Sequence, residues 1–478
     1  METIPTLIDG ELVTAKSGQF IESHSPATGE LLGRIPRLDK EDVDRAVDSA
    51  AKAAVSWRKT SVQERVAMVN ALADRLEQRG EELARLDALD NGTPIWVMRR
   101  IVKMASTFMR YQANLATEVH GETVPDEFDH LNISIQEPFG VTARIVPFNH
   151  PLMNATVKLV PALVTGNTVL LKPSEFTSLS ALELAKDFME LFPRGVINVI
   201  TGFAQEAGHA IIDHPVVRRI AFVGGANGGR AIQERAARAG VKNVTLELGG
   251  KNPIVVFPDA DLDAAAEAAV TGMNFGWQGE SCASTSRLMV HESIHDEFVA
   301  RVAAKIDALK PGDPLDETVD TGAIASQPQF EKVLNYIDLG KQEGRLVAGG
   351  GRATVDTLED GLFVRPTMFD GISPGARIAQ EEIFGPVLVA IKFKDYDDAV
   401  QIANGIEYGL TASVFTSDYK TAHRFSRDVE AGYVWVNTVS RLLPGTPYGG
   451  IKNSGIGREG HLEELYSFTN TKNITFKF

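Results

Sequence analysis

The feature that most constrains this chain is a regular alternation of short apolar segments and amphipathic segments between residues 140 and 250. Five segments have the pattern of β-strands, namely GVTARIVPF, NTVLLKP, GVINVITG, VRRIAFVGG and VKNVTLELGG, and helix-like segments separate them. Strands that are joined by helical crossovers run parallel, and such a sheet is covered by helices. The pattern therefore predicts an α/β fold in which these five strands form a sheet wound in the Rossmann manner.

The crossovers decide where a ligand can bind. The first one, HPLMNATVKLVPALVTG, has the length of one helix that ends at Gly166 and Asn167. Ligands of such sheets bind beyond the carboxyl ends of the strands, where this chain has PFNHP, KPSE, TGFAQEAG, VGGANGG and LELGGKNP. Two of these segments open helices with glycine-rich turns, whose free N–H groups can hold a pyrophosphate. The G-x-G-x-x-G motif is absent, so the turns alone do not establish a dinucleotide site.

Glu247 lies near the end of the fifth predicted strand. Val244, Leu246 and Leu248 share one face of that strand, which leaves Thr245 and Glu247 on the other face. The two glycines that follow remove side-chain cover and allow a close approach. We therefore expect the carboxylate of Glu247 to point into the ligand cleft.

Composition excludes several classes of protein. The 478 residues include one cysteine, Cys282, which cannot form an internal disulfide or a Cys-rich zinc site. The formal charge of −15 opposes attraction to nucleic acid or anionic lipid. The N-terminus METIPTLIDGEL does not resemble a signal peptide, and no apolar stretch is long enough to span a bilayer. We expect an unexported cytoplasmic protein that binds neither membrane nor nucleic acid and holds no metal.

Taken together, the motifs resemble those of the aldehyde dehydrogenase superfamily, from about residue 5 to the C-terminus. The resemblance rests on PFNHP, LLKPSE, LELGGKNP, QGESC, QEEIFGPV and YGGIKNSGIGREG, which occur in the family's order. It implies a hydrolytic, non-acylating enzyme that oxidises an aldehyde to a carboxylic acid. Ala204 and Gly225 stand where the family often has glycine and a hydroxyl residue, which puts the tightness of cofactor binding in question.

The resemblance also implies catalytic roles. Cys282 would attack the aldehyde carbon and form a thiohemiacetal and then a thioester, because a thiolate is strongly nucleophilic. Asn149 and the backbone N–H of Cys282 would stabilise the oxyanion. Glu247 would activate the water that hydrolyses the thioester. Lys158 resembles the family's buried lysine, although an ordinary helix lysine is an almost equally good interpretation.

The cofactor implied by the resemblance is NAD. Lys172 and Glu175 would hold the adenosine ribose, and a carboxylate at Glu175 would repel the 2′-phosphate of NADP, which should bind more weakly. Glu382, Phe384 and Gln329 would position the nicotinamide end. The remaining residues expected at the cofactor are Ile145, Val146, Phe148, Gly224, Gly225 and Leu248.

The resemblance divides the chain into three parts. Residues 1–121 and 140–249 would form the NAD-binding domain, and residues 250–450 would form an α/β catalytic domain with strands in NPIVVF, RLMVH, SVFTSD and GYVWVNT. Residues 122–139 and 466–478 alternate like strands and would form an oligomerisation sheet, since an unpaired terminal strand needs a partner. We expect a homodimer or a homotetramer.

The substrate is the least constrained feature. By position, the aldehyde tunnel would be lined by His150, Met153, Asn154, Val157, Trp277, Ser281, Leu442 and Tyr448. This mixture suits a medium-sized apolar or aromatic aldehyde. If Arg441 turned inward, it would hold a carboxylate and favour an acid semialdehyde, but a solvated loop arginine is the better interpretation. A coenzyme A-acylating enzyme and a non-catalytic relative stay open as alternatives, although the presence of Glu247, Cys282 and Asn149 argues against both.

Overall fold

The five predicted strands form one sheet in the computed structural model, which describes residues 3–478. They are β7 (Val141–Ile145), β8 (Thr168–Lys172), β9 (Ile197–Val199), β10 (Arg219–Gly224) and β11 (Asn243–Leu248), all parallel, in the order β11-β10-β7-β8-β9. The short strand β21 (Gly455–Ile456) adds an antiparallel edge beside β11. The chain starts at β7 and winds first to one side and then to the other. A crevice therefore lies at the carboxyl ends of β7 and β10, as expected for a Rossmann-like sheet.

The first crossover differs from the single helix that the sequence suggests. It consists of α5 (Pro151–Thr156), a 3-10 turn (Val157–Leu159) and α6 (Val160–Val164). Pro161 has no N–H to donate to the carbonyl of Val157, so a continuous helix is broken there. The prediction of one helix was wrong, and the break places Lys158 on an irregular turn. The other crossovers contain α7 (Leu179–Glu183), α8 (Ala185–Leu191), a π-helical turn (Ala204–Gly208), α9 (His209–Asp213) and α10 (Ala226–Ala239).

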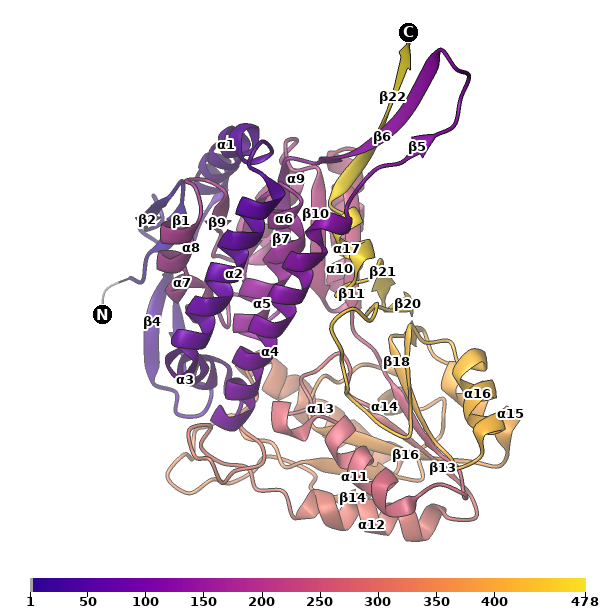
Figure 1. Cartoon of the computed structure of the whole chain (residues 1–478). Helices are drawn as coiled ribbons and strands as arrows, with labels where there is room; N and C mark the ends of the chain where they lie inside the picture. The colour runs from indigo at the N-terminus through magenta and orange to yellow at the C-terminus, as the bar shows by residue number, and fades with distance from the viewer. Residues whose placement is uncertain (1–2) are drawn as a thin grey trace.

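Helices from the N-terminal part of the chain help to cover both faces of this sheet (Figure 1). On one face, α1 (Lys40–Trp57) shares an apolar core with α9, α10 and the strands. On the other face, α2 (Val62–Gln78), α3 (Gly80–Asn91) and α4 (Ile95–Asn114) pack over the helices of the first two crossovers. The strands that precede α1 form two hairpins, β1 (Thr6–Ile8) with β2 (Glu11–Val13) and β3 (Phe20–His24) with β4 (Leu31–Pro36).

A second sheet carries the residues that follow position 250. Its order is β14-β15-β16-β13-β12-β18-β19, and β14 is antiparallel to its neighbour. The strands are β12 (Pro253–Val256), β13 (Arg287–His291), β14 (Arg345–Ala348), β15 (Thr367–Asp370), β16 (Val387–Phe393), β18 (Thr411–Phe415) and β19 (Tyr433–Val436). One face is covered by α11 (Leu262–Gly272) and α12 (His295–Asp307), and the other by α13 (Gln327–Glu343), α14 (Arg377–Gln380), α15 (Tyr396–Asn404) and α16 (Tyr419–Asp428). The pair β17 (Tyr408–Gly409) and β20 (Ile451–Lys452) lies where the chain returns toward the first sheet.

A three-stranded sheet projects from the body of the molecule at the top right of Figure 1. It contains β5 (Thr123–Val124), β6 (His130–Pro138) and the C-terminal strand β22 (Thr469–Lys477), which follows α17 (Leu462–Tyr466). We call it the arm. The central pairing is antiparallel and runs from Thr469 opposite Pro138 to Lys477 opposite His130. Among residues 3–478, no helix is both long enough and apolar enough to cross a bilayer.

Candidate active site

Asn149 follows β7, where the parallel strands end. Its side chain is 5% exposed, and its Nδ2 donates a hydrogen bond to the carbonyl of Glu280, 3.0 Å away. The preceding backbone is fixed as well, because Asn91 and Thr177 both donate to the carbonyl of Phe148. An amide nitrogen carries two hydrogens, so Asn149 keeps one N–H for another acceptor.

Cys282 lies on the loop that joins a 3-10 turn (Phe275–Trp277) to β13. Its Sγ is 3.3 Å from the hydroxyl of Tyr448, and its carbonyl accepts a 2.7 Å hydrogen bond from Asn252. The backbone N–H of Cys282 donates to no other group among the described residues. The Asn149 amide reaches this same loop at Glu280, two residues before Cys282, and each of the two residues keeps an N–H without another acceptor among the described residues.

Glu247 lies at the end of β11, as the strand pattern predicts. Its side chain is 5% exposed and lies close enough to Cys282 for each group to shift the pKa of the other, and its Oε1 is buried without a hydrogen-bond partner among the described residues. Opposite Glu247, on β21, stands Gly455 with a φ of +143°. A Cβ on Gly455 would lie 2.1 Å from the carbonyl of Leu246, so only glycine allows β21 to close this side of the carboxylate.

Burial controls the protonation of this pair. Burial, and then repulsion from Glu459, raise the pKa of Glu247 to about 8. Burial, and then the neighbouring Glu247 carboxylate, raise the pKa of the Cys282 thiol well above its usual range. Lys158 opposes both shifts, because a nearby cation favours the anionic form of each group. The resting site therefore favours a neutral thiol and a carboxyl group poised to ionise near neutral pH.

Lys158 is tied to the C-terminal segment. Its Nζ forms an ion pair with Oε2 of Glu459. Burial disfavours the charged amine, but the carboxylates of Glu459, Glu464 and Glu247 together outweigh this effect, and the pKa of Lys158 is raised. Lys158 is therefore a charged group within reach of Glu247, and the interpretation as an ordinary surface lysine does not fit the structure.

The proposed adenosine residues lie at the end of β8. Lys172 is 2% exposed, and its Nζ is 3.7 Å from a carboxylate oxygen of Glu175. On β10, which lies on the other side of β7, Gly224 ends the strand and Gly225 caps α10 without a side-chain hydrogen bond. A Cβ on Gly225 would meet no atom within 4 Å, so the first turn of this 14-residue helix is open to a ligand. Ile145, Val146 and Leu248 are buried beside these strand ends.

The proposed nicotinamide residues come from the second sheet. Glu382 accepts a hydrogen bond from the N–H of Gly250, 3.1 Å away. Phe384 adopts a left-handed backbone with a φ of +56°, and the side-chain amide of Gln329 donates to its carbonyl at 2.6 Å. The ring of Phe384 meets that of Phe148 edge-on, with centroids 5.8 Å apart. A pocket at this end is lined by Glu382 and Phe384 together with Gly250, Lys251 and Ser281.

The expected tunnel residues are only partly brought together. The rings of His150 and Trp277 meet edge-on at 5.8 Å, and Tyr448 contacts Cys282. Burial lowers the pKa of His150 to about 4, so this ring is neutral. Val157 and Asn154 are 3% exposed, and the Asn154 amide donates to the carbonyl of Pro147 at 3.3 Å. Met153 packs at the edge of the apolar core, while Ser281 and Leu442 are partly exposed.

Arg441 has an exposed side chain, and its carbonyl accepts a 2.9 Å hydrogen bond from the indole of Trp435. Its backbone is thus fixed while its guanidinium stays in solvent. This agrees with a loop arginine rather than with a buried carboxylate-binding group.

Sequence reasoning did not single out several buried residues around the site. Glu459 lies within the quoted motif GREG, but its partner is distant in the sequence. Asn252 and Lys251 lie within the motif GGKNP, and Asn252 fixes the carbonyl of Cys282. Lys251 is 1% exposed, and burial lowers the pKa of its amine to about 7. The motifs contain these residues, but their contacts could not be predicted from the sequence because they depend on the tertiary fold.

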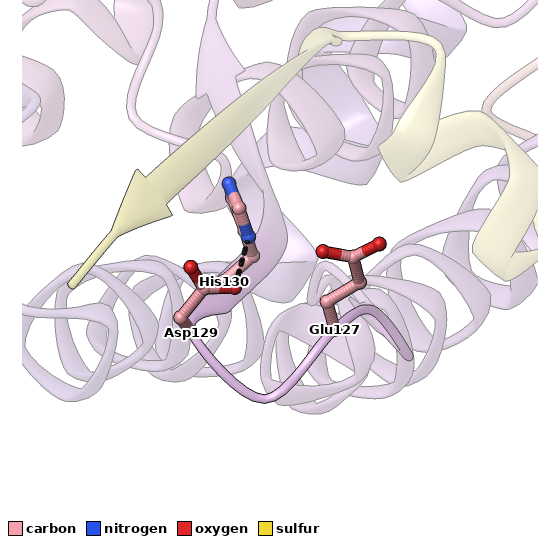
Figure 2. Close-up of side chains that lie close together, drawn as sticks. All are labelled: Glu127, Asp129 and His130. Atoms are coloured by element: carbon pink, nitrogen blue, oxygen red, sulfur yellow. Dashed lines mark hydrogen bonds and ion pairs between the residues drawn. The ribbon is translucent and has the colours of Figure 1, made fainter.

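One group of side chains with metal-binding chemistry lies away from the site, at the turn before β6. Glu127, Asp129 and His130 lie close together there, and His130 Nδ1 is 2.7 Å from Asp129 (Figure 2). Figure 2 shows Glu127 standing apart from this hydrogen-bonded pair. Both carboxylates are exposed, and such groups are common on surfaces without an ion. None of the three residues belongs to the candidate active site.

Comparisons with known proteins agree with this geometry. Residues 12–474 match the model of the aldehyde dehydrogenase family. The aldehyde dehydrogenase tropH of Talaromyces stipitatus is 41% identical over 474 residues, which cover 98% of this chain and 92% of that protein. The hydroxyisobutyraldehyde dehydrogenase of Mycolicibacterium austroafricanum is 41% identical over 468 residues, with the same coverage. The crystal structure of PnpE in complex with nicotinamide adenine dinucleotide superposes with a TM-score of 0.97 at 37% identity, covering 100% of this chain and 98% of that one.

Proposed function

Since this chain belongs to the aldehyde dehydrogenase family, we propose that it oxidises a medium-sized apolar or aromatic aldehyde to the carboxylic acid through a covalent intermediate on Cys282. The observation that carries the proposal is the convergence of Cys282, Glu247 and Asn149 at one buried place between two sheets. The three residues supply a nucleophile, a base and an oxyanion donor.

Cys282 acts first. Its Sγ bonds to the aldehyde carbon as the thiol proton passes to the carboxylate of Glu247, a group near enough to raise the pKa of the thiol. The carbonyl oxygen becomes an oxyanion that accepts the second N–H of Asn149 and the backbone N–H of Cys282. Asn252 supports this step by holding the carbonyl of Cys282, which fixes the orientation of the loop.

The cofactor is NAD, as named for the structural relative PnpE. The residues present fit such a dinucleotide, because the open helix start at Gly225 suits a pyrophosphate and the carboxylate of Glu175 suits ribose hydroxyls. Lys172 and Glu175 would hold the adenosine ribose, and Glu382, Phe384 and Gln329 would hold the nicotinamide end. Bound NAD accepts the hydride that leaves the thiohemiacetal carbon.

Glu247 completes the reaction. After the thioester has formed on Cys282, Glu247 releases the thiol proton to solvent. The ionised carboxylate then takes a proton from water, and the resulting hydroxide attacks the thioester carbon and displaces the Cys282 thiolate. Lys158 favours the ionised form of Glu247, and Glu459 fixes Lys158. A base placed beside the thioester favours hydrolysis over transfer to coenzyme A.

The substrate class follows from the walls of the expected tunnel. His150 is neutral and meets Trp277 edge-on, and Met153 and Leu442 add apolar surface. The side chain of Arg441 is exposed, so Arg441 itself is not fixed to hold a substrate carboxylate. The relative from Mycolicibacterium is named for hydroxyisobutyraldehyde, an uncharged branched aldehyde. We also propose a reducing, cytoplasmic location, which keeps the single thiol free, and assembly through the arm.

A panel of aldehydes tests this assignment. NADH formation is measured with benzaldehyde-type, terpenoid, branched aliphatic, betaine-type and acid semialdehyde substrates, with and without coenzyme A. The proposal expects the highest kcat/KM with an aromatic or terpenoid aldehyde and no change on adding coenzyme A. A clear preference for succinic semialdehyde that Arg441→Ala abolishes would instead establish the semialdehyde alternative, and a requirement for coenzyme A would establish the acylating one.

A further inference from the structure

A cluster of charged side chains lies near Glu247, and part of it lines a pocket with Glu247. Its centre is Arg144 on β7, which is 1% exposed. The guanidinium donates through Nη2 to Oε1 of Glu464 on α17, and through Nη1 to Oε1 of Glu459 at 3.1 Å. Burying such a pair is unfavourable unless each charge is compensated, so its presence calls for a reason.

The carboxylate of Glu464 is held on three sides. Besides Arg144, the side chain of Gln112 on α4 donates to it at 3.1 Å, and the N–H of Gly460 donates at 2.8 Å. Glu464 is 3% exposed, and all three partners are donors. Burial, and then the nearby Glu459 carboxylate, raise the pKa of Glu464, whereas Arg144, Lys158 and the N–H of Gly460 favour its anionic form.

Glu459 connects this pair to the catalytic residues. One of its oxygens accepts from Arg144 and the other pairs with Lys158. Its carboxylate therefore lies between two cations, and its distance from each depends on how strongly each cation attracts it. Lys158 in turn is a charged neighbour of Glu247.

The far end of the cluster is anchored at the junction of α17 and β22. The guanidinium groups of Arg144 and Arg219 lie over the ring of Phe468, at 4.9 Å and 4.4 Å from its centroid. Arg219 also donates to the carbonyl of Ser467 at 2.8 Å. These contacts fix the backbone that carries Glu464, so the carboxylate has little freedom to move away from Arg144.

We propose that Arg144 and Glu464 form a positioning pair, which holds the Glu459 carboxylate against Lys158 and so sets the charge that Glu247 experiences. Neither residue touches the thiol. The inference rests on the proposed role of Glu247 as the base that hydrolyses the thioester.

Other charged or titratable groups also face Glu247, and the test must leave them unchanged. They are Cys282 and Tyr448 at the thiol, Lys158 from the broken crossover, Glu459, and Glu382 from the second sheet. Arg458 and Glu247 line one pocket, and the guanidinium of Arg458 donates to the carbonyls of Gly450 and Gly457. Arg144 and Glu464 stand behind these groups, with Arg219 beside Arg144.

The proposal can be tested by the direction in which two substitutions shift the ionisation of Glu247. In Glu464→Gln, the whole charge of Arg144 attracts Glu459 away from Lys158, so Lys158 acts more strongly on Glu247 and favours its ionised form. In Arg144→Met, Glu459 and Glu464 lose their shared cation, and the excess negative charge disfavours ionisation of Glu247. The pH at which deacylation is half-maximal should fall in the first variant and rise in the second, each by about one unit or less. The double variant should return toward the wild-type value.

Hydrolysis of p-nitrophenyl acetate provides a readout without cofactor, because the activated ester acylates a thiol directly. Mass spectrometry confirms acetylation of Cys282, and the deacylation rate is followed against pH. Thermal unfolding of each variant shows whether a change in the deacylation rate reflects a loss of structure. Arg144→Lys keeps the positive charge, so it should retain most of the wild-type dependence of deacylation on pH even if Arg144→Met folds poorly.

Opposite shifts with restoration in the double variant support the pair. Unchanged midpoints in folded Glu464→Gln and Arg144→Met, or shifts of the same sign, overturn it even if the melting temperature falls. If the wild type forms no acetyl adduct on Cys282, the proposed function fails instead, so the two failures are distinguishable.

Discussion

At the scale of single residues, the chemistry depends on how one proton is distributed between Cys282 and Glu247. Burial raises the pKa of both groups, so neither is ionised in the resting site at low pH. The carboxyl group ionises near pH 8 and can then accept the proton of the thiol or of a water molecule. The two groups titrate as a pair, so a measured midpoint belongs to the pair.

This leads to a pH dependence with a definite sign. A general base works only when deprotonated, so deacylation should be slow near pH 6 and rise through an apparent pKa near that of Glu247, about 8. The measurement is the hydrolysis rate of a preformed acyl-enzyme as a function of pH. Glu382→Gln serves as the control, because Glu382 contributes only weakly to this shift. A rate that stays constant between about pH 6 and 9 would remove Glu247 as the titrating base.

Local motifs were sufficient to predict the residues at the centre of the site. Cys282, Glu247 and Asn149 each stand in a short pattern, and the structure brings them together. The contacts behind them could not be predicted, because Arg144 and Glu464 are 320 positions apart and pair only after the first sheet has met α17. No periodicity in either segment reveals that pairing.

At the scale of elements, the turn after β8 is expected to select the cofactor. Lys172 is buried and its amine lies 3.7 Å from Glu175, so the carboxylate is held at the strand end. Burial lowers the pKa of Lys172, while Glu175 opposes this effect. A carboxylate in this position accepts hydrogen bonds from ribose hydroxyls and repels a phosphate.

Substitution of Glu175 tests this selection. In Glu175→Ser the repulsion is lost and Lys172 becomes free to attract a phosphate, so the ratio of kcat/KM for NAD over NADP should fall by about tenfold, or ~1.4 kcal/mol. The measurement is kcat/KM with NAD and with NADP, for the wild type and for Glu175→Ser. Glu183→Ser on α7 is a matched control, since Glu183 pairs with Arg79 rather than with Lys172. Equal efficiency of the two cofactors in the wild type would contradict the argument.

Elements were predictable where hydrophobic periodicity is strong. All five parallel strands of the first sheet lie where apolar segments alternate with amphipathic ones, because strands of a helix-covered parallel sheet are largely buried. Hydrophobic periodicity does not reveal the break in the first crossover, since its apolar residues continue through Pro161 without interruption. Backbone hydrogen bonding rather than hydrophobic pattern ends α5, and this places Lys158 on a turn.

At the scale of the whole molecule, the arm leaves apolar surface in solvent. Leu131, Ile133 and Ile135 on β6 stand opposite Phe476, Ile474 and Lys472 on β22, so one face of the arm is largely apolar. Phe476 on this face is 43% exposed. A projecting sheet of three strands with an open face of this kind suits contact with a second copy of the chain.

We therefore predict that Phe476→Asp weakens assembly. A charge on the apolar face would have to be desolvated at the contact, so the variant should dissociate at protein concentrations where the wild type is dimeric or tetrameric. Thr475→Asp, on the opposite face of the same strand, is the matched control. Light scattering coupled to size exclusion gives the masses, and a monomeric wild type would rule out this role for the arm.

The division of labour between Cys282 and Glu247 is the central claim, and one measurement tests it most directly. Stopped-flow absorbance follows NADH when Glu247→Gln is mixed with NAD and aldehyde, and mass spectrometry looks for an acyl group on Cys282. Because glutamine keeps the shape of the side chain but cannot take a proton, we predict a burst of about one NADH per active site and an acyl adduct that accumulates. The steady rate that follows should be lowered by about 10²–10⁴, as expected for loss of a general base. A Glu247→Gln enzyme that turns over at the wild-type rate, without an adduct on Cys282, would contradict the account.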